Sequence, residues 1–552
     1  MGTSHIPLMS RAILAWIALW PLLPCPGAIY YVDVDAASGG NGSLERPWRG
    51  LSDIRRLSPG DSVLFQRGDM WRGTLLVPWS GSPGNPITFG AYGSGPDPIL
   101  TGSDDLTNGA YSWQRSSKGK NEYYCAFARL EPPDTIWLDG TNVTKGAAGS
   151  LADHQWDWAD DDSLGFSTVY LRDDSGDPGA SGVLVESAAR DYIIYATGMH
   201  DLVFENLELC DTDNGINGFG AMTFHACTDI TIRGCTIHDI VAHGIRFLGT
   251  GSAHHTIERN VLYNALPVYD YPCLIGLYQT DTATISKNTI YNALGLEAVG
   301  VTIQGGSTHI TIEENEIRNC NGDHVYLRDF ASGNTVRYNY IHDGTGVGVM
   351  LRQGANDNDV YGNLILEIRN CIGLSDVDGS VANLNICNNT CRNETSASYD
   401  GLSIDGKHSN IRIQNNIVWT RDGYALWVDA AASSAVTSDY NCFYNTSSGH
   451  LIHWGQTDYP PRVFSRYRKA SGQDAHSINQ NPRFADIPGG DYSLAVNSPC
   501  INSGISLDHL YRLLDPNSTW PYGVRSLDPD SVAARWEMGA YAYKTATTLG
   551  YP

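Results

Sequence analysis

The sequence has little positive charge for its length. Its 552 residues include 36 lysines and arginines but 60 aspartates and glutamates, which gives a formal net charge of −24 at pH 7. A nucleic-acid-binding protein needs a basic surface to neutralise phosphates, so this composition argues against that class of partner. Hydrophobic residues make up 42% of the chain, which is enough to build a substantial core.

Residues that favour long helices are also scarce. There are only 7 methionines, against 58 glycines, 30 tyrosines and 14 tryptophans. Glycine weakens helices and aromatic residues favour strands, so the composition predicts a β-rich protein with many turns. Architectures built from long helices are excluded.

Long apolar runs are absent beyond the N-terminus. Arg11 precedes an apolar run from Ala12 to Leu23, and small and turn-forming residues follow as far as Ala28. This order is typical of a secretory signal peptide, and the run is short for a membrane-spanning helix. We therefore expect residues 1–28 to be removed and the mature protein to be secreted, with no membrane span.

Paired zinc-binding cysteine motifs are absent as well. Of the 12 cysteines, Cys25 lies in the predicted signal peptide, and the others include no two Cys-x-x-Cys pairs. We expect small buried thiols together with one or two disulfides, for which Cys387 and Cys391 are close enough in sequence. The sequence predicts no metal site and no cofactor, with a calcium requirement left open.

What the sequence does contain is a repeat of 24 to 29 residues. In each repeat an apolar residue is followed three positions later by Asn, and two positions after that by another apolar residue, as in Val336, Asn339 and Ile341. The Asn position is occupied in turn by Asn206, Cys235, Asn260, Asn288, Asn315, Asn339, Asn363, Asn389, Asn416 and Asn441. Short β-branched and aromatic runs, broken by Gly, Asn and Asp at this period, are typical of a solenoid.

The repeat predicts an all-β fold, a single-stranded right-handed parallel β-helix. Strands of successive coils stack in parallel, alternate side chains fill a narrow interior, and stacked Asn side chains can bond from coil to coil. Other repeat folds are excluded. The sequence lacks the Leu-x-x-Leu-x-Leu motif of leucine-rich repeats, its repeat is too short for a propeller blade, and it lacks the hexapeptide repeat of a left-handed β-helix. We expect about ten or more coils, with a cap at each end.

The flanks of the repeat array resemble those of a known superfamily. Residues 59–73 include Pro-Gly-Asp-Ser-Val-Leu-Phe and Arg-Gly-Asp-Met-Trp-Arg-Gly, residues 84–93 read Gly-Asn-Pro-Ile-Thr-Phe-Gly-Ala-Tyr-Gly, and residues 498–504 read Ser-Pro-Cys-Ile-Asn-Ser-Gly. These segments are similar to the terminal regions of secreted right-handed β-helix proteins of the pectin-lyase-like superfamily. The resemblance implies a capped β-helix in a carbohydrate-active protein. It does not imply one activity, because this fold hosts many chemistries.

We accordingly divide the chain into five parts. They are the signal peptide at 1–28, the N-terminal cap and first coils at 29–102, an irregular β insertion at 103–195, the regular coils at 196–456 and the C-terminal cap at 457–552. The insertion holds Trp113, Trp137, Trp156 and Trp158, which suit either a sugar-binding wall or the core of a small subdomain.

Candidate site residues follow from the strand expected after each Asn turn. In a strand such as His324 to Arg328 the second and fourth residues are apolar and face inward, so the third and fifth face outward. Stacked coils then place these residues in two columns, with neighbours about 4.8 Å apart. One column is Arg246, Gly276, Thr302, Tyr326, Met350, Gly373, Ser403 and Trp427, and the other is Leu248, Tyr278, Gln304, Arg328, Arg352, Ser375, Asp405 and Asp429.

The stacked arginines Arg328 and Arg352 suggest an anionic ligand. Two cations one strand spacing apart repel each other, and a bound uronate carboxylate or sulfate would relieve the repulsion. The alternative is a salt-bridge network with Asp329, Asp376 or Asp378.

Two enzyme mechanisms fit these columns. In a polysaccharide lyase, arginine neutralises the substrate carboxylate, Lys407, Tyr326 or His324 abstracts the adjacent proton, and a second such group protonates the leaving oxygen. In a glycoside hydrolase two carboxylates flank the scissile bond. Asp405 and Asp429, one coil apart, would then lie about 5 Å from each other, which is the retaining geometry.

The sequence therefore predicts a monomeric, secreted enzyme that degrades a polysaccharide, most directly a lyase acting on a uronate-containing polymer by β-elimination. A glycoside hydrolase and a non-catalytic carbohydrate-binding or cell-surface protein are the alternatives. The expected catalytic residues are His324, Tyr326, Arg328, Arg352, Asp376, Asp378, Asp405 and Lys407, and the expected substrate-binding residues are His225, Arg246, Tyr278, Gln304, Trp427 and Asp429.

No catalytic set of a named relative can be transferred to this chain. The clustered calcium-binding aspartates of pectate lyases, the combined Asn-x-Asp, Asp-Asp, Gly-His-Gly and Arg-x-Lys set of polygalacturonases and the Asp-Pro-His-Glu motif of mannuronan epimerases are absent. The expected site therefore rests on the geometry of the columns.

Overall fold

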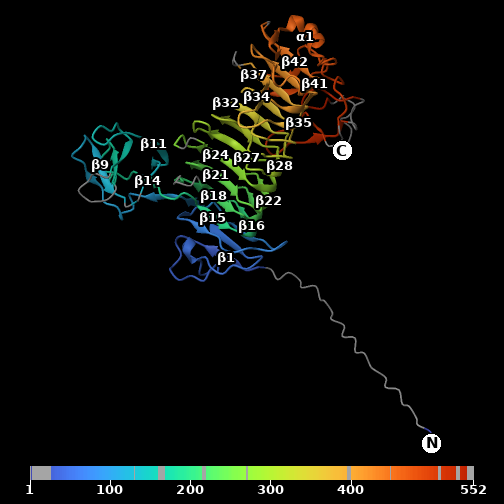
Figure 1. Cartoon of the computed structure of the whole chain (residues 1–552). Coiled ribbons are helices and arrows are strands. Elements are labelled where there is room, and N and C mark those ends of the chain that lie inside the picture. The colour runs from blue at the N-terminus through green and yellow to red at the C-terminus, as the bar shows by residue number, and fades with distance from the viewer. Residues whose placement is uncertain are drawn as a thin grey trace.

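The structure is a computed structural model. It describes residues 2, 27–127, 129, 131–159, 168–213, 219–268, 271–394, 399–447, 449–507, 511–529 and 535–543. Apart from residues 2, 27 and 28, the expected signal peptide lies outside these described residues. The chain winds into a parallel β-helix whose coils stack from the blue N-terminal end to the orange C-terminal end (Figure 1).

The first face of the β-helix is a sheet of 13 parallel strands. They are β1 (Ile29–Val32), β2 (Ser62–Gln66), β5 (Ile87–Tyr92), β16 (His200–Glu205), β19 (Thr228–Arg233), β22 (Ser252–Glu258), β25 (Thr280–Ser286), β28 (Thr308–Glu313), β31 (Thr335–Arg337), β33 (Asp359–Tyr361), β35 (Ala382–Cys387), β38 (Ser409–Gln414) and β41 (Val436–Asp439). This length of stack confirms the expectation of about ten or more coils.

The other two faces belong to one sheet of 23 strands. The second face comprises β3 (Met70–Arg72), β6 (Ile99–Thr101), β17 (Glu208–Cys210), β20 (Thr236–Ile240), β23 (Val261–Ala265), β26 (Thr289–Ala293), β29 (Glu316–Cys320), β36 (Thr390–Asn393), β39 (Ile417–Thr420) and β42 (Cys442–Asn445). The third face comprises β4 (Leu75–Leu76), β15 (Ile194–Thr197), β18 (Gly220–His225), β21 (His243–Leu248), β24 (Cys273–Tyr278), β27 (Val299–Gln304), β30 (Val325–Leu327), β37 (Asp400–Asp405), β40 (Leu426–Asp429), β43 (Ile452–Gly455) and β44 (Thr457–Tyr459). The long strands β32 (Tyr340–Leu351) and β34 (Leu364–Ser375) run through both faces.

Buried asparagines join the coils at the turn between the first and second faces. Nδ2 of Asn339 donates to Oδ1 of Asn363 (3.0 Å) and to the carbonyl of Ile312 (2.9 Å), and Oδ1 of Asn339 accepts from the amide and Nδ2 of Asn315 (3.1 and 3.0 Å). The same side-chain bond links Asn260, Asn288, Asn315, Asn339, Asn363, Asn389, Asn416 and Asn441 in succession. The expected ladder is confirmed over these coils.

The first rung of that ladder was misplaced. Strand pairing aligns Glu208 with Thr236, so Leu207 rather than Asn206 occupies the position equivalent to Cys235. Asn206 lies in the preceding turn with a left-handed φ of 54°, a conformation that Asn tolerates better than most residues.

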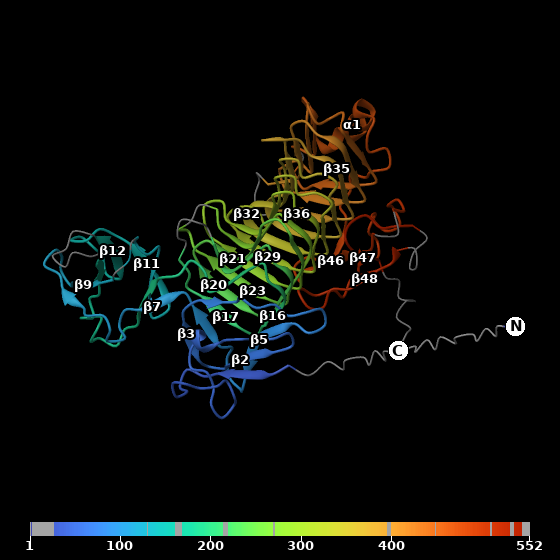
Figure 2. The same cartoon turned by 60° about the horizontal axis from the view of Figure 1, so that its bottom comes forward.

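Residues 103–188 leave the β-helix between β6 and β15 and form a separate sheet, which we call the side lobe (Figures 1 and 2). Its eight strands are β7 (Ser103–Asp105), β14 (Val185–Ala188), β10 (Ile136–Leu138), β11 (Thr141–Lys145), β12 (Gln155–Ala159), β13 (Thr168–Arg172), β9 (Glu122–Ala126) and β8 (Gln114–Arg115). Trp113 and Trp156 are buried in its core, and Trp137 packs on Val241 and Leu266 of the β-helix. These three tryptophans therefore serve packing rather than an exposed sugar-binding wall.

The C-terminal segment covers one end of the β-helix and then returns along its side. The helices η2 (Pro461–Val463) and α1 (Phe464–Ser471) follow the last coil, and Phe464 and Tyr467 of α1 join the main core. The chain then runs back along the side of the β-helix (Figure 2). There Trp520 Nε1 donates to the carbonyl of Tyr338, next to Asn339 of the ladder (2.7 Å). This segment carries β45 (Phe484–Asp486), β46 (Asp491–Leu494), β47 (Leu513–Leu514) and β48 (Ser526–Leu527), and the remaining short helix, η1 (Leu51–Asp53), lies near the N-terminal end.

The cysteines form no disulfide within the described part of the chain. All 11 are buried and free, so the expected disulfides are wrong for these residues. Cys391 points into the main core, whereas Cys387 lies in an outer cluster with Tyr338 and Leu514. The two thiols thus face opposite sides of the coil wall and cannot pair.

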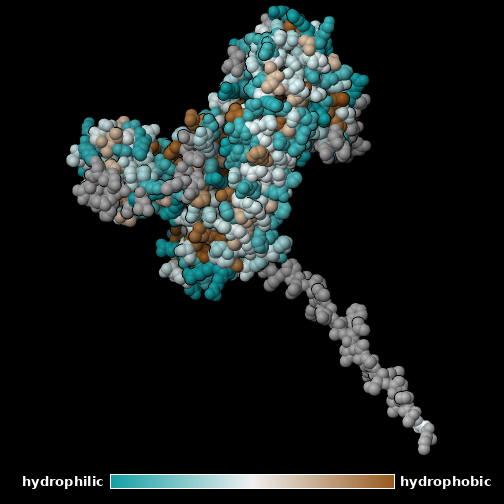
Figure 3. All heavy atoms as spheres, viewed as in Figure 1, coloured by the Kyte–Doolittle hydropathy of each residue, from teal (hydrophilic) through white to brown (hydrophobic). Residues whose placement is uncertain are grey.

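The visible surface of the β-helix in Figure 3 is mainly hydrophilic, with hydrophobic side chains gathered near its N-terminal end and beside the side lobe. Within the described residues, no helix has the length and apolar character needed to cross a membrane.

Candidate functional site

The outward-facing columns lie on the third face in the register expected from the sequence. Backbone pairing places Arg246 beside Gly276, Gly276 beside Thr302, and Thr302 beside Tyr326. The pairing continues through Met350, Gly373, Ser403 and Trp427. The intervening apolar residues, such as Leu327, are fully buried. The strand alternation on which the site prediction depends is therefore confirmed.

A cleft of about 770 Å³ opens on this face over β21, β24, β27, β30 and β32. The columns contribute Arg246, Tyr278, Thr302, Gln304, Tyr326, Arg328, Met350 and Arg352 to its lining, and neighbouring segments contribute Tyr271, Leu296, Glu297, Asn321, Asp323, Thr345 and Arg369 among others. This volume lies in the range of sites that enclose small ligands. The cleft brings together six of the sequence-predicted residues, namely Tyr326, Arg328, Arg352, Arg246, Tyr278 and Gln304.

Four arginines reach the cleft. Among the described residues, no carboxylate forms an ion pair with Arg246, Arg352 or Arg369. Arg328 donates from Nε to Oε1 of Gln304 (2.9 Å) and lies 3.6 Å from a carboxylate oxygen of Asp329. The described lining of the cleft therefore has more arginines than acidic residues, in a protein whose formal net charge is −24.

The ring of Tyr326 relieves part of the repulsion between the stacked arginines. The guanidinium carbons of Arg328 and Arg352 lie 5.2 and 5.3 Å from its centroid, which is within cation–π range. Its hydroxyl and the Nε of Arg352 are buried and have no hydrogen-bond partner among the described residues. Burial raises the pKa of Tyr326, so its hydroxyl stays protonated at neutral pH and can donate a proton.

Asp323 is one of the cleft residues that the sequence analysis missed, with Glu297 and Arg369. It lies in the turn before β30, where its Oδ1 accepts from the backbone amide of Val347 (3.0 Å). Loss of hydration raises the pKa of Asp323 to about 6, although nearby Arg352 and Arg369 favour the ionised form. Glu297, a second carboxyl residue in the cleft, raises this pKa further. A carboxyl group that titrates near neutrality is suited to proton transfer.

His324 does not reach the cleft, which corrects its expected catalytic role. Its side chain is fully buried, its ring packs over Gly344 of the next coil, and its Nδ1 lies 3.4 Å from the carbonyl of Val347. Burial lowers the pKa of His324 to about 4, so the imidazole is neutral. Strand alternation assigns His324 to the same outward side as Tyr326, but the neighbouring coil covers it.

The remaining predicted catalytic residues lie on later coils, outside the cleft lining. Asp376 accepts from the backbone amide of Lys407 (2.9 Å), Asp378 accepts from Gln353 (3.1 Å), and Asp405 accepts from Ser403 (3.2 Å). Neither Asp376 nor Asp378 therefore neutralises the arginines, and Lys407 does not share a cleft with them.

The other predicted substrate-binding residues also lie outside the cleft lining. His225 is exposed at the end of β18, on the N-terminal side of the cleft. Trp427 stacks on His453 with ring centroids 3.8 Å apart, and Asp429 accepts from the backbone amides of Ala431 and Ala432. Trp427 and Asp429 form a separate surface three coils beyond Met350, on the same face.

The chain resembles known β-helix proteins in sequence and structure. The family model described as a right handed beta helix region matches residues 273–443. A solved structure titled as the complex of XylC with xylose is 15% identical, covers 79% of this chain and 87% of its own, and has a TM-score of 0.58. No curated protein matches the chain.

Two further solved structures overlap the chain with lower scores. The GH136 lacto-N-biosidase from Eubacterium ramulus is 14% identical, covers 77% of this chain and 68% of its own, and has a TM-score of 0.41. A rhamnogalacturonan lyase is 11% identical, covers 86% of this chain and 96% of its own, and also has a TM-score of 0.41. Together with the strand topology, the family match shows that this chain is a right-handed parallel β-helix.

Proposed function

We propose that the protein is a secreted carbohydrate-active enzyme that binds a uronate-containing polysaccharide in the arginine cleft and cleaves it by β-elimination. The observation that carries this proposal is a group of cleft arginines that form no ion pair with any acidic residue that the structure describes, namely Arg246, Arg352 and Arg369. The planar guanidinium group matches a carboxylate with two parallel hydrogen bonds. The structure with xylose, which shares the fold, agrees with a sugar as the ligand.

The cleft residues divide the chemistry between them. Arg352 and Arg369 bind the C6 carboxylate of the uronate and thereby make the neighbouring C5 proton more acidic. Asp323 accepts that proton, the electron pair of the broken C5–H bond forms the C4–C5 double bond, and the C4–O4 bond breaks with its electron pair left on O4. The hydroxyl of Tyr326 donates its proton to the departing O4. Asp323 thus replaces Lys407 and His324 as the candidate base.

A glycoside hydrolase is the second candidate, because Asp323 and Glu297 share the cleft. A carboxyl group with a raised pKa is also the general acid of such enzymes, and a second carboxylate serves as base or nucleophile. This pair takes the place of Asp405 and Asp429 in the hydrolase hypothesis, since those two lie outside the cleft lining.

A panel of uronate-containing and neutral polysaccharides distinguishes these functions. Each digest is assayed both for new reducing ends and for the ultraviolet absorbance of an unsaturated uronate. We expect both signals to rise together on a uronate polymer. Reducing ends without absorbance would favour the hydrolase, and an absence of cleavage on all polymers, with binding retained, would favour the non-catalytic alternative.

The pH profile should identify the role of Asp323. A general base must be ionised, so for a lyase we expect kcat/KM to rise as the pH increases through about 6, the pKa of Asp323 in the free protein. A general acid must be protonated, so for a hydrolase kcat/KM would instead fall as the pH increases through the same value. Initial rates measured from pH 4 to 9 at constant ionic strength decide between the two slopes. A flat profile between pH 5 and 7 would contradict both roles.

A further inference from the structure

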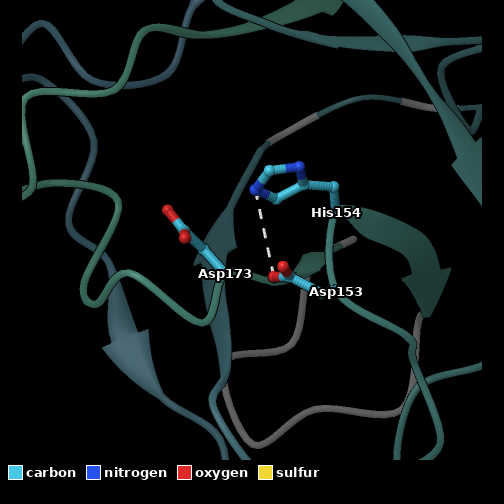
Figure 4. A group of neighbouring side chains, drawn as sticks. All are labelled: Asp153, His154 and Asp173. Carbon is cyan, nitrogen blue, oxygen red and sulfur yellow. Dashed lines mark ion pairs between the residues drawn. The ribbon is translucent and has the colours of Figure 1, made fainter.

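The side lobe contains a group of metal-ligating side chains that the proposed reaction does not use. Asp153 and His154 directly precede β12, and Asp173 directly follows β13, so the antiparallel pairing of these strands brings the three residues to one end of the lobe (Figure 4). One potential ligand atom of each residue lies within 4.8 Å of the others. From this group we propose that the side lobe binds one divalent transition-metal ion of the zinc class.

The buried carboxylate of Asp173 is the independent observation that points to a ligand. The residue is 1% exposed, and its Oδ1 accepts from the amide and hydroxyl of Ser175 (2.8 and 2.6 Å). Its Oδ2 is buried without a hydrogen-bond partner among the described residues. Leaving a charged oxygen desolvated and unpaired is costly, and a cation bound between the three side chains would remove that cost.

The neighbouring arginine, Arg172, binds other partners than Asp173. Arg172 forms two hydrogen bonds with Asp174, both 2.9 Å long, and donates a third to the carbonyl of Leu151 (2.9 Å). Among the residues that the structure describes, no lysine or arginine forms an ion pair with Asp173. The backbone amide of Asp174 donates to Oδ1 of Asp153 (2.9 Å), which orients this carboxylate toward the group.

The donor set selects the class of metal. One imidazole and two carboxylates suit zinc and similar first-row ions, whereas calcium and magnesium prefer oxygen donors alone. Ligands of a tetrahedral ion, each about 2.0–2.2 Å away, are about 3.3–3.6 Å apart. The three side chains, whose ligand atoms lie within 4.8 Å of one another, would therefore have to move closer together to share one coordination sphere. The side chains of His154 and Asp153 are 59% and 46% exposed, which gives the ion a path of entry and leaves room for water ligands.

The backbone holds the group in place. The amide of His154 donates to the carbonyl of Arg172 (2.9 Å), and His154 adopts a left-handed φ of 58° that turns its side chain at the strand end. A metal bound here would join the start of β12 to the end of β13. We therefore expect it to stabilise the lobe without entering the chemistry of the cleft.

The test measures zinc binding to the full mature chain, from which any affinity tag has been removed and metals have been stripped with chelator. Equilibrium dialysis against zinc chloride should show one saturable site per chain, and His154→Ala should weaken it at least about tenfold. The matched control is His254→Ala, because the His254 side chain is also 59% exposed and lies 3.7 Å from the carboxylate of Asp229. Circular dichroism checks that both variants are folded.

Two further measurements complete the test. Asp173→Asn keeps the size of the side chain but removes its charge, and it should also lose the site. Zinc should raise the midpoint of thermal unfolding of the wild type, followed by tryptophan fluorescence, but not that of His154→Ala. The proposal is overturned if the wild type shows no saturable zinc site, if His154→Ala and His254→Ala bind zinc equally well, or if calcium competes with zinc at equal concentration.

Discussion

Replacement of Arg352 by alanine should lower kcat/KM on a uronate-containing polymer by about 10²- to 10³-fold, the usual effect of removing one group that stabilises developing charge. Arg352 lines the cleft, has no described acidic partner, and faces the ring of Tyr326. Without it the substrate carboxylate keeps its full negative charge, so the neighbouring proton is harder to remove. The measurement is the initial rate of formation of the unsaturated product.

The control for this prediction is Arg412→Ala. Arg412 is an exposed arginine on β38 of the first face, and its removal changes the net charge of the chain by the same amount. We expect Arg412→Ala to keep the wild-type rate and Arg352→Lys to recover only part of it, because an ammonium group cannot form the two parallel hydrogen bonds of a guanidinium. Unchanged turnover in folded Arg352→Ala would remove this residue from the site.

Replacement of Asn339 by alanine should destabilise the β-helix by about 3–5 kcal/mol, because several buried polar groups lose their partners at about 1–3 kcal/mol each. Asn339 is fully buried, and its carboxamide bonds to Asn315, Asn363 and the carbonyl of Ile312. Alanine supplies none of these bonds, so polar atoms of Asn315, Asn363 and Ile312 lose their partner. The midpoint of denaturant unfolding, followed by circular dichroism, measures the loss.

Asn385→Ala provides the matched control for the ladder. Asn385 lies on β35 of the first face, is only partly buried, and makes one side-chain hydrogen bond, to Oδ1 of Asp359 (2.7 Å). Its replacement should cost about 1 kcal/mol or less. Equal destabilisation by the two substitutions would show that the ladder contributes no more than an ordinary surface asparagine.

The repeat and the outward columns could be predicted from the sequence because both depend on local periodicity. An Asn at each turn and alternation along each strand determine the ladder and the neighbours of Tyr326. Spacing alone misplaced the first rung, because Asn206 lies one position before the ladder site: Glu205 pairs with Arg233 and Glu208 with Thr236, which aligns Asn206 with Gly234. The alternation of inward and outward positions also predicted an outward His324, although the next coil covers this side chain.

The full lining of the cleft could not be predicted, because it includes residues outside the two columns. Asp323 and Glu297 belong to turns, and Arg369 lies within β34, away from the two columns. In the sequence Asp323 is part of an ordinary Asn-Gly-Asp turn, and its raised pKa arises only when it is desolvated beside Val347 of the next coil. The side lobe likewise showed only irregular patterning, so the approach of Asp173 to His154 required the strand pairing.

The position of a bound uronate oligosaccharide tests the central claim most directly. A crystal structure of Asp323→Asn with a uronate tetrasaccharide should place a sugar carboxylate against Arg352 and Arg369, with a C5 hydrogen facing residue 323 and a glycosidic oxygen near the hydroxyl of Tyr326. A tetrasaccharide bound instead along Asp405 and Trp427, or on the side lobe with the arginine cleft empty, would contradict the account.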